Sequence, residues 1–387
     1  MIRPEVFVKK IFNSLLPLLL AVPSAFSAVT PQRLETLTLK TLPPVEAPAV
    51  PLPYYAGGAR YDLTSLPAYI FTEEEKVSDA VVKAIGRTRS TLDVALYNLQ
   101  IPAAADALLK ARDRGVKVRV ILDYDHVYPK AGHEMQELID AGMDVRMMKG
   151  RGGSGSMHCK YALFDGTLLE TGSANWSLSA ENASYENMMF LSDRHILAGY
   201  QADFEWMWAQ AKPAGNPGSY SSSPGAPPSD PSPSVDFNGT TLPNYVFSPR
   251  GGTEAAMVRA IDAARSEADV AMFSFTSKPA MEALSRASAR GVKVKMLLYV
   301  KSAFPFRAEA KKNNIEVRLK EGRVGNGLMH NKYSVLDGSL LINGSFNWSA
   351  TAENLNTENT IFTKIPAYVT HDKAEFDKLF SQGLEPQ

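Results

Sequence analysis

The sequence predicts an α/β protein of two homologous domains, each a mixed β-sheet flanked by helices, packed with approximate two-fold symmetry. Three observations support this prediction. The chain has 387 residues, 45% hydrophobic and 21% charged, so two domains of ordinary size can each bury a core. Strand-like and helix-like segments alternate along the chain. The pattern of the first half then recurs in the second.

The predicted organisation begins with an export segment. Basic residues near the N-terminus precede a short apolar stretch, 11–22, and small residues fit a cleavage site before Ala28. We divide the chain into a signal peptide at 1–28, a proline-rich tether at 29–54, a first domain at 55–212, a linker at 213–240 and a second domain at 241–387. The linker is assigned because 17 of the 22 residues in 213–234 are Pro, Gly or Ser. We therefore expect an exported protein, periplasmic or secreted.

The two halves repeat one another at a nearly constant offset. Residues 94–97 match 270–273, and residues 114–118 match 290–294, at an offset of 176 that becomes 172 later in each half. Within the first copy we expect a strand at 92–97, a helix at 103–114 ended by Gly115, and a strand at 116–122. Equivalent residues of the two domains can then meet at one shared interface.

Both halves carry one long motif, His-x-Lys-x4-Asp-x6-Gly-Ser-x-Asn, and a glutamate stands 28 residues after each histidine. Two copies with identical spacing argue against a purely structural role for the histidines. The candidate site residues are His158, Lys160, Asp165, Ser173, Asn175 and Glu186 in the first copy, and His330, Lys332, Asp337, Ser345, Asn347 and Glu358 in the second.

We expect each His-x-Lys pair to lie in a strand, where both side chains point to one face. The Asp-Gly step that follows predicts a two-residue hairpin turn. In that register Ser173 lies opposite His158, and the second copy has the same pairing. The two aspartates are catalytic candidates by their place in the motif, although the turn alone already explains them.

These residue types suit the cleavage of a phosphodiester. Lysine ammoniums neutralise the anionic oxygens, and the asparagines and serines can donate hydrogen bonds to them. A neutral histidine can attack phosphorus while a protonated one donates to the departing alkoxide. Each histidine also needs an acceptor for its other ring nitrogen, and the repeated glutamate can supply it.

The doubled motif resembles the phospholipase D superfamily, with a spacing similar to the branch that contains small bacterial periplasmic nucleases. The resemblance runs from about Tyr54 to the end of the chain. It implies that the two motifs meet at a domain interface and that a phosphohistidine forms without a metal or another cofactor. By the same resemblance His158 is the nucleophile and His330 the general acid. The lysines and asparagines then hold the phosphate, and the glutamates orient the histidines.

Several substrate classes stay open. A phospholipase D acting on membrane phospholipid is favoured by export, by the fusion of two units and by a formal net charge of zero. A non-specific endonuclease is favoured by the motif branch and by a basic rim before the histidines, formed by Lys149, Arg151, Arg318, Lys320 and Arg323. A cardiolipin-synthase-like transferase is a third candidate. A non-catalytic phosphate-binding module would leave two intact motifs unexplained.

Other features receive structural interpretations. His126 and His133 lie near acidic residues but are not repeated in the second half, so no metal site is expected. Glycines just before each histidine suggest a mobile rim. Cys159 is expected to face inward. We expect a monomer that carries both half-sites and has no protein partner.

Overall fold

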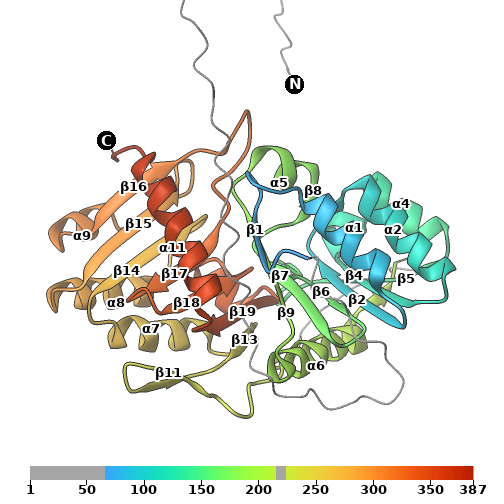
Figure 1. The fold of residues 1–387 in the computed structure, drawn as a ribbon, viewed down its shortest axis with the longest axis horizontal. Helices are drawn as coiled ribbons and strands as arrows, with labels where there is room; N and C mark the ends of the chain where they lie inside the picture. The colour runs from blue at the N-terminus through green and yellow to red at the C-terminus, as the bar shows by residue number, and fades with distance from the viewer. Residues whose placement is uncertain (1–65, 215–223, 387) are drawn as a thin grey trace, which may run out of the picture. The chain divides into compact units, whose positions relative to one another are not determined.

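The computed structural model describes residues 66–214 and 224–386. They form two large mixed sheets with helices on both faces, which confirms the predicted fold class (Figure 1). The first sheet has the order β1-β9-β7-β6-β2-β4-β5-β10, and the second has the order β13-β19-β18-β17-β14-β15-β16. In both sheets the three strands β2, β4 and β5, or β14, β15 and β16, run parallel and the other pairs are antiparallel.

The strands of the first sheet are β1 (Tyr69–Phe71), β2 (Thr91–Leu96), β4 (Lys117–Asp123), β5 (Asp144–Met148), β6 (Lys160–Phe164), β7 (Leu168–Gly172), β9 (Asn187–Leu191) and β10 (Lys212–Pro213). Those of the second sheet are β13 (Tyr245–Ser248), β14 (Glu267–Met272), β15 (Lys293–Tyr299), β16 (Glu316–Lys320), β17 (Lys332–Leu336), β18 (Leu340–Gly344) and β19 (Glu358–Thr363). Two small ribbons pair β3 (Leu99–Gln100) with β8 (Trp176–Ser177), and β11 (Val235–Phe237) with β12 (Thr240–Leu242).

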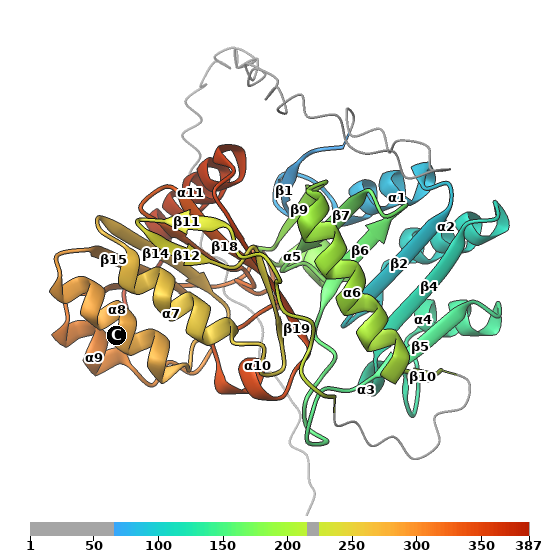
Figure 2. The same cartoon turned by 90° about the horizontal axis from the view of Figure 1, so that it is seen from below.

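Helices cover both sheets in the same way in the two halves (Figures 1 and 2). One face of the first sheet carries α1 (Val77–Arg87), α2 (Pro102–Asp113) and α4 (His133–Asp140), and the other carries α6 (Arg194–Gln210). The second sheet is covered by α7 (Thr253–Ala263), α8 (Lys278–Ala289) and α9 (Arg307–Lys312), with α11 (Pro366–Ser381) opposite. Short turns form α3 (Tyr124–Val127), α5 (Leu178–Ala183) and α10 (Ala350–Asn354).

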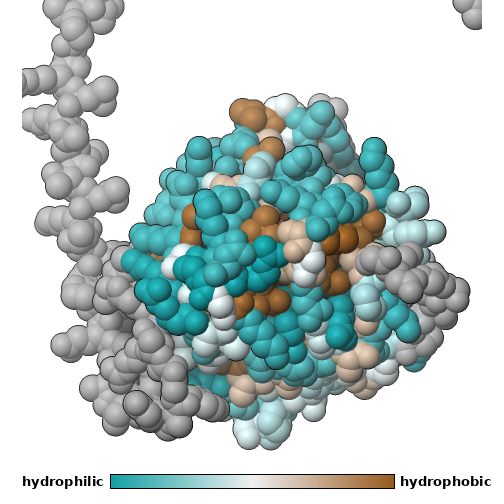
Figure 3. All heavy atoms as spheres, turned by 90° about the vertical axis from the view of Figure 1, so that its right-hand side faces the viewer, coloured by the Kyte–Doolittle hydropathy of each residue, from teal (hydrophilic) through white to brown (hydrophobic). Residues whose placement is uncertain are grey.

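The first predicted strand–helix–strand unit is confirmed within one residue at each boundary. It corresponds to β2, α2 and β4, and Gly115 ends the helix with a φ of 90°, which favours glycine. Figure 3 shows the outer side of the first half, where hydrophilic residues predominate and hydrophobic ones form small groups. Across residues 66–214 and 224–386, no helix combines the length and apolar character needed to cross a bilayer.

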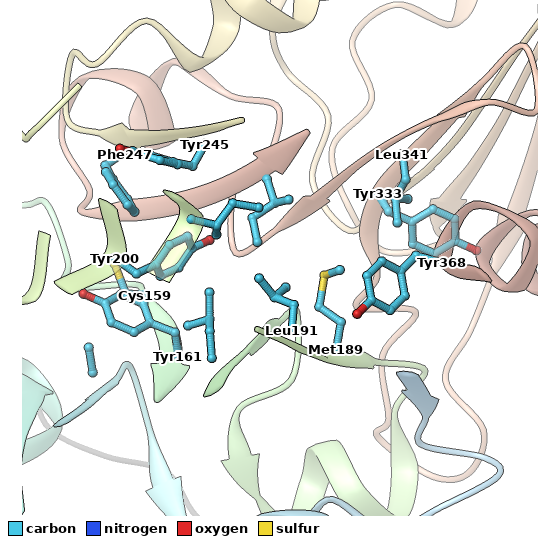
Figure 4. Close-up of a cluster of buried hydrophobic side chains, with 14 of the residues drawn as sticks. Cys159, Tyr161, Met189, Leu191, Tyr200, Tyr245, Phe247, Tyr333, Leu341 and Tyr368 are labelled. Atoms are coloured by element: carbon cyan, nitrogen blue, oxygen red, sulfur yellow. The ribbon is translucent and has the colours of Figure 1, made fainter. Parts of the chain in front are cut away.

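A third hydrophobic core lies between the two sheets, in addition to one core within each half. This shared core contains residues of β6, β9 and α6 from the first half and of β13, β17 and α11 from the second. Figure 4 shows Tyr161 and Tyr200 on one side of it and Tyr333 and Tyr368 on the other. Cys159 is buried in the same cluster, as the sequence predicts. Because the shared core is apolar and continuous, the halves pack as parts of one unit.

Each Asp-Gly step turns the chain, but the predicted hairpin register is wrong. Phe164 pairs with Leu168, and the second copy pairs its strands in the same way. The amide of Thr167 donates to Phe164 O at 3.0 Å, so Thr167 is an extra residue beyond the two-residue turn. This bulge shifts the pairing by one position, and Ser173 does not lie opposite His158.

The predicted linker at 213–240 is too long at both ends. Pro213 still belongs to β10, which pairs with β5 of the first sheet. Near the other end, β11 buries Phe237, and Asp230 accepts a hydrogen bond from Asn244 N at 2.7 Å. These contacts could not be predicted from the polar composition of residues 224–234. The predicted signal peptide at 1–28 and tether at 29–54 lie outside the described residues.

Two reciprocal loops fasten the halves together. The loop before His158 donates Arg151 N to Leu355 O, and the loop before His330 donates Arg323 N to Ala183 O. A Cβ on Gly155 would lie 2.2 Å from Leu355 O. These glycines, which the sequence suggests belong to a mobile rim, therefore permit close backbone packing between the halves.

We expect Gly327→Ala to destabilise the protein by about 3–5 kcal/mol, since a Cβ there would lie 1.8 Å from the backbone oxygen of Ala183. Gly86→Ala is the matched control, because Gly86 lies in α1 with no atom within 4 Å of a new Cβ. Urea unfolding of both variants would measure the difference. Equal midpoints would contradict the packing role of Gly327.

Candidate active site

The two motif histidines lie where the halves meet. His158 N donates to Thr357 O at 2.9 Å, and His330 N donates to Tyr185 O at 2.9 Å. Each histidine therefore precedes its strand, β6 or β17, in an extended segment that is bonded to the other half. The prediction that the motifs meet at a domain interface agrees with this arrangement. The side chains are 13% exposed for His158 and 8% for His330, so both histidines are largely shielded from solvent.

Each histidine is held by the glutamate of the opposite half. His158 Nδ1 lies 2.8 Å from Glu358 Oε2, and His330 Nδ1 lies 2.7 Å from Glu186 Oε1. A carboxylate can only accept, so each neutral imidazole donates from Nδ1 and keeps a lone pair on Nε2. The spacing of 28 residues predicts the two glutamates, but it does not reveal this crossed pairing.

The two serines stand behind the glutamates. Ser173 Oγ donates to Glu186 Oε2 at 2.7 Å, and Ser345 Oγ donates to Glu358 Oε2 at 2.6 Å. Both serines are fully buried, and each also accepts a backbone N–H. The predicted contact between these hydroxyls and the phosphate is therefore corrected, because their only hydrogen is already directed at a glutamate.

Both motif lysines are buried beside the histidines. Lys160 Nζ donates to His158 O at 2.8 Å, and Lys332 Nζ lies 3.0 Å from both ring nitrogens of His330. Burial lowers the pKa of Lys160 to about 8 and that of Lys332 to about 7. The charges of Glu186 and Glu358 oppose this lowering, and a bound phosphodiester would add negative charge that favours both ammoniums further.

The histidines are poised in the neutral form. Burial lowers the pKa of His158 to about 4, against the opposing charge of Glu358. Burial, followed by the charges of Lys332 and Lys160, also lowers the pKa of His330. Burial raises the pKa of Glu186 to about 7. The site therefore presents two unprotonated Nε2 atoms flanked by positive charge.

The motif asparagines retain unused hydrogen-bonding capacity. Asn175 Oδ1 and Asn347 Oδ1 are buried and have no hydrogen-bond partner among the described residues. Each asparagine follows its serine by two residues. Since that serine contacts a glutamate, the asparagine side chain begins close to the glutamate as well. These oxygens can only accept, so the atom of each asparagine that could donate to a phosphate oxygen is Nδ2.

The motif aspartates are not in the site, which corrects their prediction as catalytic residues. Asp165 Oδ1 accepts hydrogen bonds from Ser90 N at 2.7 Å and Ser90 Oγ at 2.8 Å, and Thr91 N donates to the same oxygen. Asp337 binds the equivalent loop, including Ser266 N at 2.8 Å. Both residues have positive φ at the turn end of the hairpin, remote from the histidine end. They fix the turn to the start of the neighbouring strand.

We expect Asp165→Ala to lower the free energy of unfolding by about 1–2 kcal/mol, since several backbone donors at the strand start lose their acceptor. The turnover number should change by less than about twofold, because no contact of Asp165 reaches the histidines. Urea unfolding and steady-state kinetics on the same preparation would measure both quantities. A large fall in turnover with unchanged stability would contradict this structural role.

An aromatic ring next to each histidine escaped the sequence prediction. Tyr97 meets His158 edge-on, with ring centroids 4.7 Å apart, and Lys160 Nζ lies 5.0 Å from the Tyr97 centroid. Phe273 makes the same contact with His330 at 4.6 Å. Both rings occupy the repeated block at offset 176, and that alignment is the signal that could have identified them.

Comparison with known proteins agrees with this geometry. Residues 81–208 and 257–380 each match the family model described as "Cardiolipin synthase, PLD-like domain", and together these matches cover more than half of the chain. The chain belongs to the phospholipase D superfamily. One family match spans the strands from β2 to β9 of the first sheet, and the other spans those from β14 to β19 of the second.

Individual relatives match only part of this phospholipase D superfamily member. A mitochondrial cardiolipin hydrolase of Xenopus tropicalis is 38% identical over 128 residues, 33% of this chain and 59% of that protein. The Homo sapiens mitochondrial cardiolipin hydrolase is 31% identical over 139 residues, 36% of this chain and 54% of that protein. The match therefore spans less than two thirds of these relatives. The solved phosphatidylserine synthase of Haemophilus influenzae has the same fold, with a TM-score of 0.62, 11% identity and coverage of 81% of this chain and 86% of that one.

The expectation of an exported, periplasmic or secreted protein is wrong by this comparison. The curated relatives that this phospholipase D superfamily member matches are named as mitochondrial proteins. Basic residues before a short apolar stretch occur in more than one kind of targeting segment, so the pattern does not specify export. The segment itself lies outside the described residues.

Proposed function

We propose that this chain hydrolyses a phospholipid phosphodiester to phosphatidic acid and an alcohol, through a covalent phosphohistidine and without a metal ion. The observation that carries the proposal is the crossed arrangement of two histidines, two glutamates and two buried lysines within one chain. The lysines supply the positive charge that the phosphate oxygens require, and each histidine has a fixed acceptor on Nδ1.

In the first step His158 Nε2 attacks phosphorus. The bond between phosphorus and the departing oxygen breaks, and His330 gives that oxygen a proton. In the second step His330 takes a proton from water, the water oxygen attacks phosphorus, and the bond to His158 breaks. Lys160, Lys332 and the two asparagines hold the phosphate oxygens throughout.

His330 needs the substrate's negative charge before it can act as the acid. Its pKa is lowered by burial and then by the Lys332 and Lys160 ammoniums. An arriving phosphodiester anion offsets those ammoniums, so substrate binding favours a proton on His330. Burial lowers the pKa of His158 to about 4, so this histidine stays neutral at pH 7, as a nucleophile must.

Two observations favour a phospholipid over nucleic acid. The relatives are named cardiolipin hydrolases, and a phospholipid needs positive charge only at its phosphate. Much of the predicted basic rim is also engaged elsewhere: Arg323 donates to the carbonyl oxygens of Thr72 and Ser184, and Arg318 Nη1 lies 2.9 Å from Glu385. A long polyanion would need those cations free.

The proposal is tested by offering the purified protein cardiolipin vesicles, phosphatidylcholine vesicles and plasmid DNA, each with and without EDTA. We expect phosphatidic acid or a head-group fragment from a lipid and intact DNA. His330→Asn serves as the inactive control for contaminating enzymes. Nicked DNA without lipid hydrolysis would replace the proposal with the endonuclease alternative. Loss of activity in EDTA would contradict the metal-free step, and a phosphatidyl product on added alcohol would reveal transfer.

Activity should fall as the pH rises through the range in which the lysines lose their protons. A lysine is charged below its pKa, so the positive charge of Lys332, with a pKa of about 7, and of Lys160, with a pKa of about 8, is present at low pH and lost above these values. We expect kcat/KM, which reports the free enzyme, to decline above about pH 7–8 by up to about tenfold per pH unit. A pH–rate profile measures this decline. A profile that stays flat to about pH 9 would contradict the role of these two lysines.

A further inference from the structure

Each motif histidine is contacted by an aromatic residue, Tyr97 in the first half and Phe273 in the second. We call each ring, together with the residues packed on it, the first or the second wall. The two walls have the same backbone arrangement but different side chains. The strand pairs β2–β4 and β14–β15 have the same parallel register, so Tyr97 and Phe273 occupy equivalent positions at the strand ends. Both rings meet their histidine at nearly the same angle, 62° and 63°. Because the backbone arrangement is the same in both halves, any chemical difference between the walls comes from the side chains that each half supplies.

On the first wall, the residue that packs against Tyr97 is polar. His126 in α3 meets Tyr97 edge-on, with ring centroids 4.5 Å apart, and both rings are partly exposed. Asp123 holds this wall in place, because its Oδ1 accepts Asp125 N at the start of α3 and its Oδ2 accepts Met157 N at 2.9 Å. The wall therefore offers a phenol and an imidazole fixed to the segment that carries His158.

On the second wall the equivalent positions are aromatic and hydroxylic. Tyr299 takes the place of Asp123 and stacks on Phe273, with ring centroids 5.3 Å apart. Ser302 takes the place of His126, and its hydroxyl donates to Phe273 O. That hydrogen bond uses the serine proton, so this wall presents mainly ring faces to a substrate.

A phosphodiester has two unlike ends, and each wall lies beside one of the two histidines. Building on the proposed phospholipid activity, we propose that Tyr97 and His126 form a subsite for an uncharged, hydroxyl-bearing alcohol of the substrate. The diacylglycerol end lies along Phe273 and Tyr299. Tyrosine and neutral histidine each donate and accept, as hydroxyl groups do. A cationic head group is disfavoured there, because Lys160 Nζ already lies over the Tyr97 ring at 5.0 Å.

The test compares two lipids with the same acyl chains in mixed micelles, phosphatidylglycerol and phosphatidylpropanol, which differ only in two head-group hydroxyls. We expect the full-length protein to prefer phosphatidylglycerol by about tenfold in kcat/KM. Tyr97→Phe and His126→Ala should each reduce that ratio about fivefold. Tyr299→Phe removes the equivalent phenol from the second wall and should leave the ratio unchanged.

The outcomes separate this subsite from the proposed function. Hydrolysis of both lipids at one rate, or an unchanged ratio in Tyr97→Phe and His126→Ala, would overturn the subsite and leave the lipid activity intact. A ratio that falls equally in Tyr299→Phe would also overturn it, because the effect would not be confined to the first wall. Hydrolysis of neither lipid would overturn both the subsite and the lipid function.

Discussion

His158→Asn is expected to lower turnover on the order of 10⁴-fold or more, because the residue that forms the covalent bond to phosphorus is lost. The substitution keeps a polar side chain of similar reach beside Glu358, so the fold should be retained. Two readouts are needed: steady-state hydrolysis, and trapping of labelled phosphate on the protein after a denaturing quench at alkaline pH, in which the phosphorus–nitrogen bond survives. We expect both to vanish.

His330→Asn should remove steady-state turnover to a similar degree but leave one partial reaction. A p-nitrophenyl phosphodiester has a leaving group that departs without a proton, so phosphorylation of His158 no longer needs an acid. Labelled protein should therefore accumulate in His330→Asn and not in His158→Asn. Trapped label in His158→Asn, with none in His330→Asn, would reverse the two roles.

The crossed glutamates give the second large effect. Glu358→Gln and Glu186→Gln should each lower turnover on ordinary substrates by about 10²-fold, because a neutral amide no longer fixes the imidazole tautomer or favours its positive charge. The two variants should differ on the p-nitrophenyl substrate. Glu186→Gln weakens the acid His330 and should recover phosphorylation, whereas Glu358→Gln weakens the nucleophile and should not.

This difference tests the pairing across the halves. If each glutamate served the histidine of its own half, the recovering variant would be Glu358→Gln. Glu170→Gln is the matched control, since Glu170 is a buried glutamate of β7 with a pKa raised by burial to about 8 and lies outside the histidine pairs. Its kinetics should match those of the unmodified protein.

Much of the fold follows from local patterns in the sequence. Strand and helix periodicity places β2, α2 and β4 correctly, and the repeat correctly indicates two matching sheets. The hairpin register could not be predicted, because one bulged residue, Thr167, reverses which side chains oppose one another. The limits of the linker escaped for a related reason: Asp230 and Phe237 are anchored by residues distant in sequence.

For the site, too, the sequence predicts which residues take part but not how they pair. The residue types and spacing predict the histidines, lysines and glutamates as site residues, because the chemistry restricts which side chains can act. Partner choice is a tertiary property, so the sequence does not reveal that Glu358 serves His158 or that Ser173 supports Glu186. The prediction that Asp165 is catalytic is wrong because a residue can recur in a motif for a structural reason. Asp165 recurs as part of a turn that the fold requires.

The crossed pairing also bears on how such a chain can diverge after duplication. In an assembly of two identical subunits, every substitution near the phosphate would appear twice, once on each side of the symmetry axis. Covalent fusion removes that constraint, because Tyr97 can change without Phe273. A substitution of Glu358 or Glu186, by contrast, directly affects the histidine of the other copy. Each half is thus free to specialise its wall and bound to preserve its neighbour's histidine.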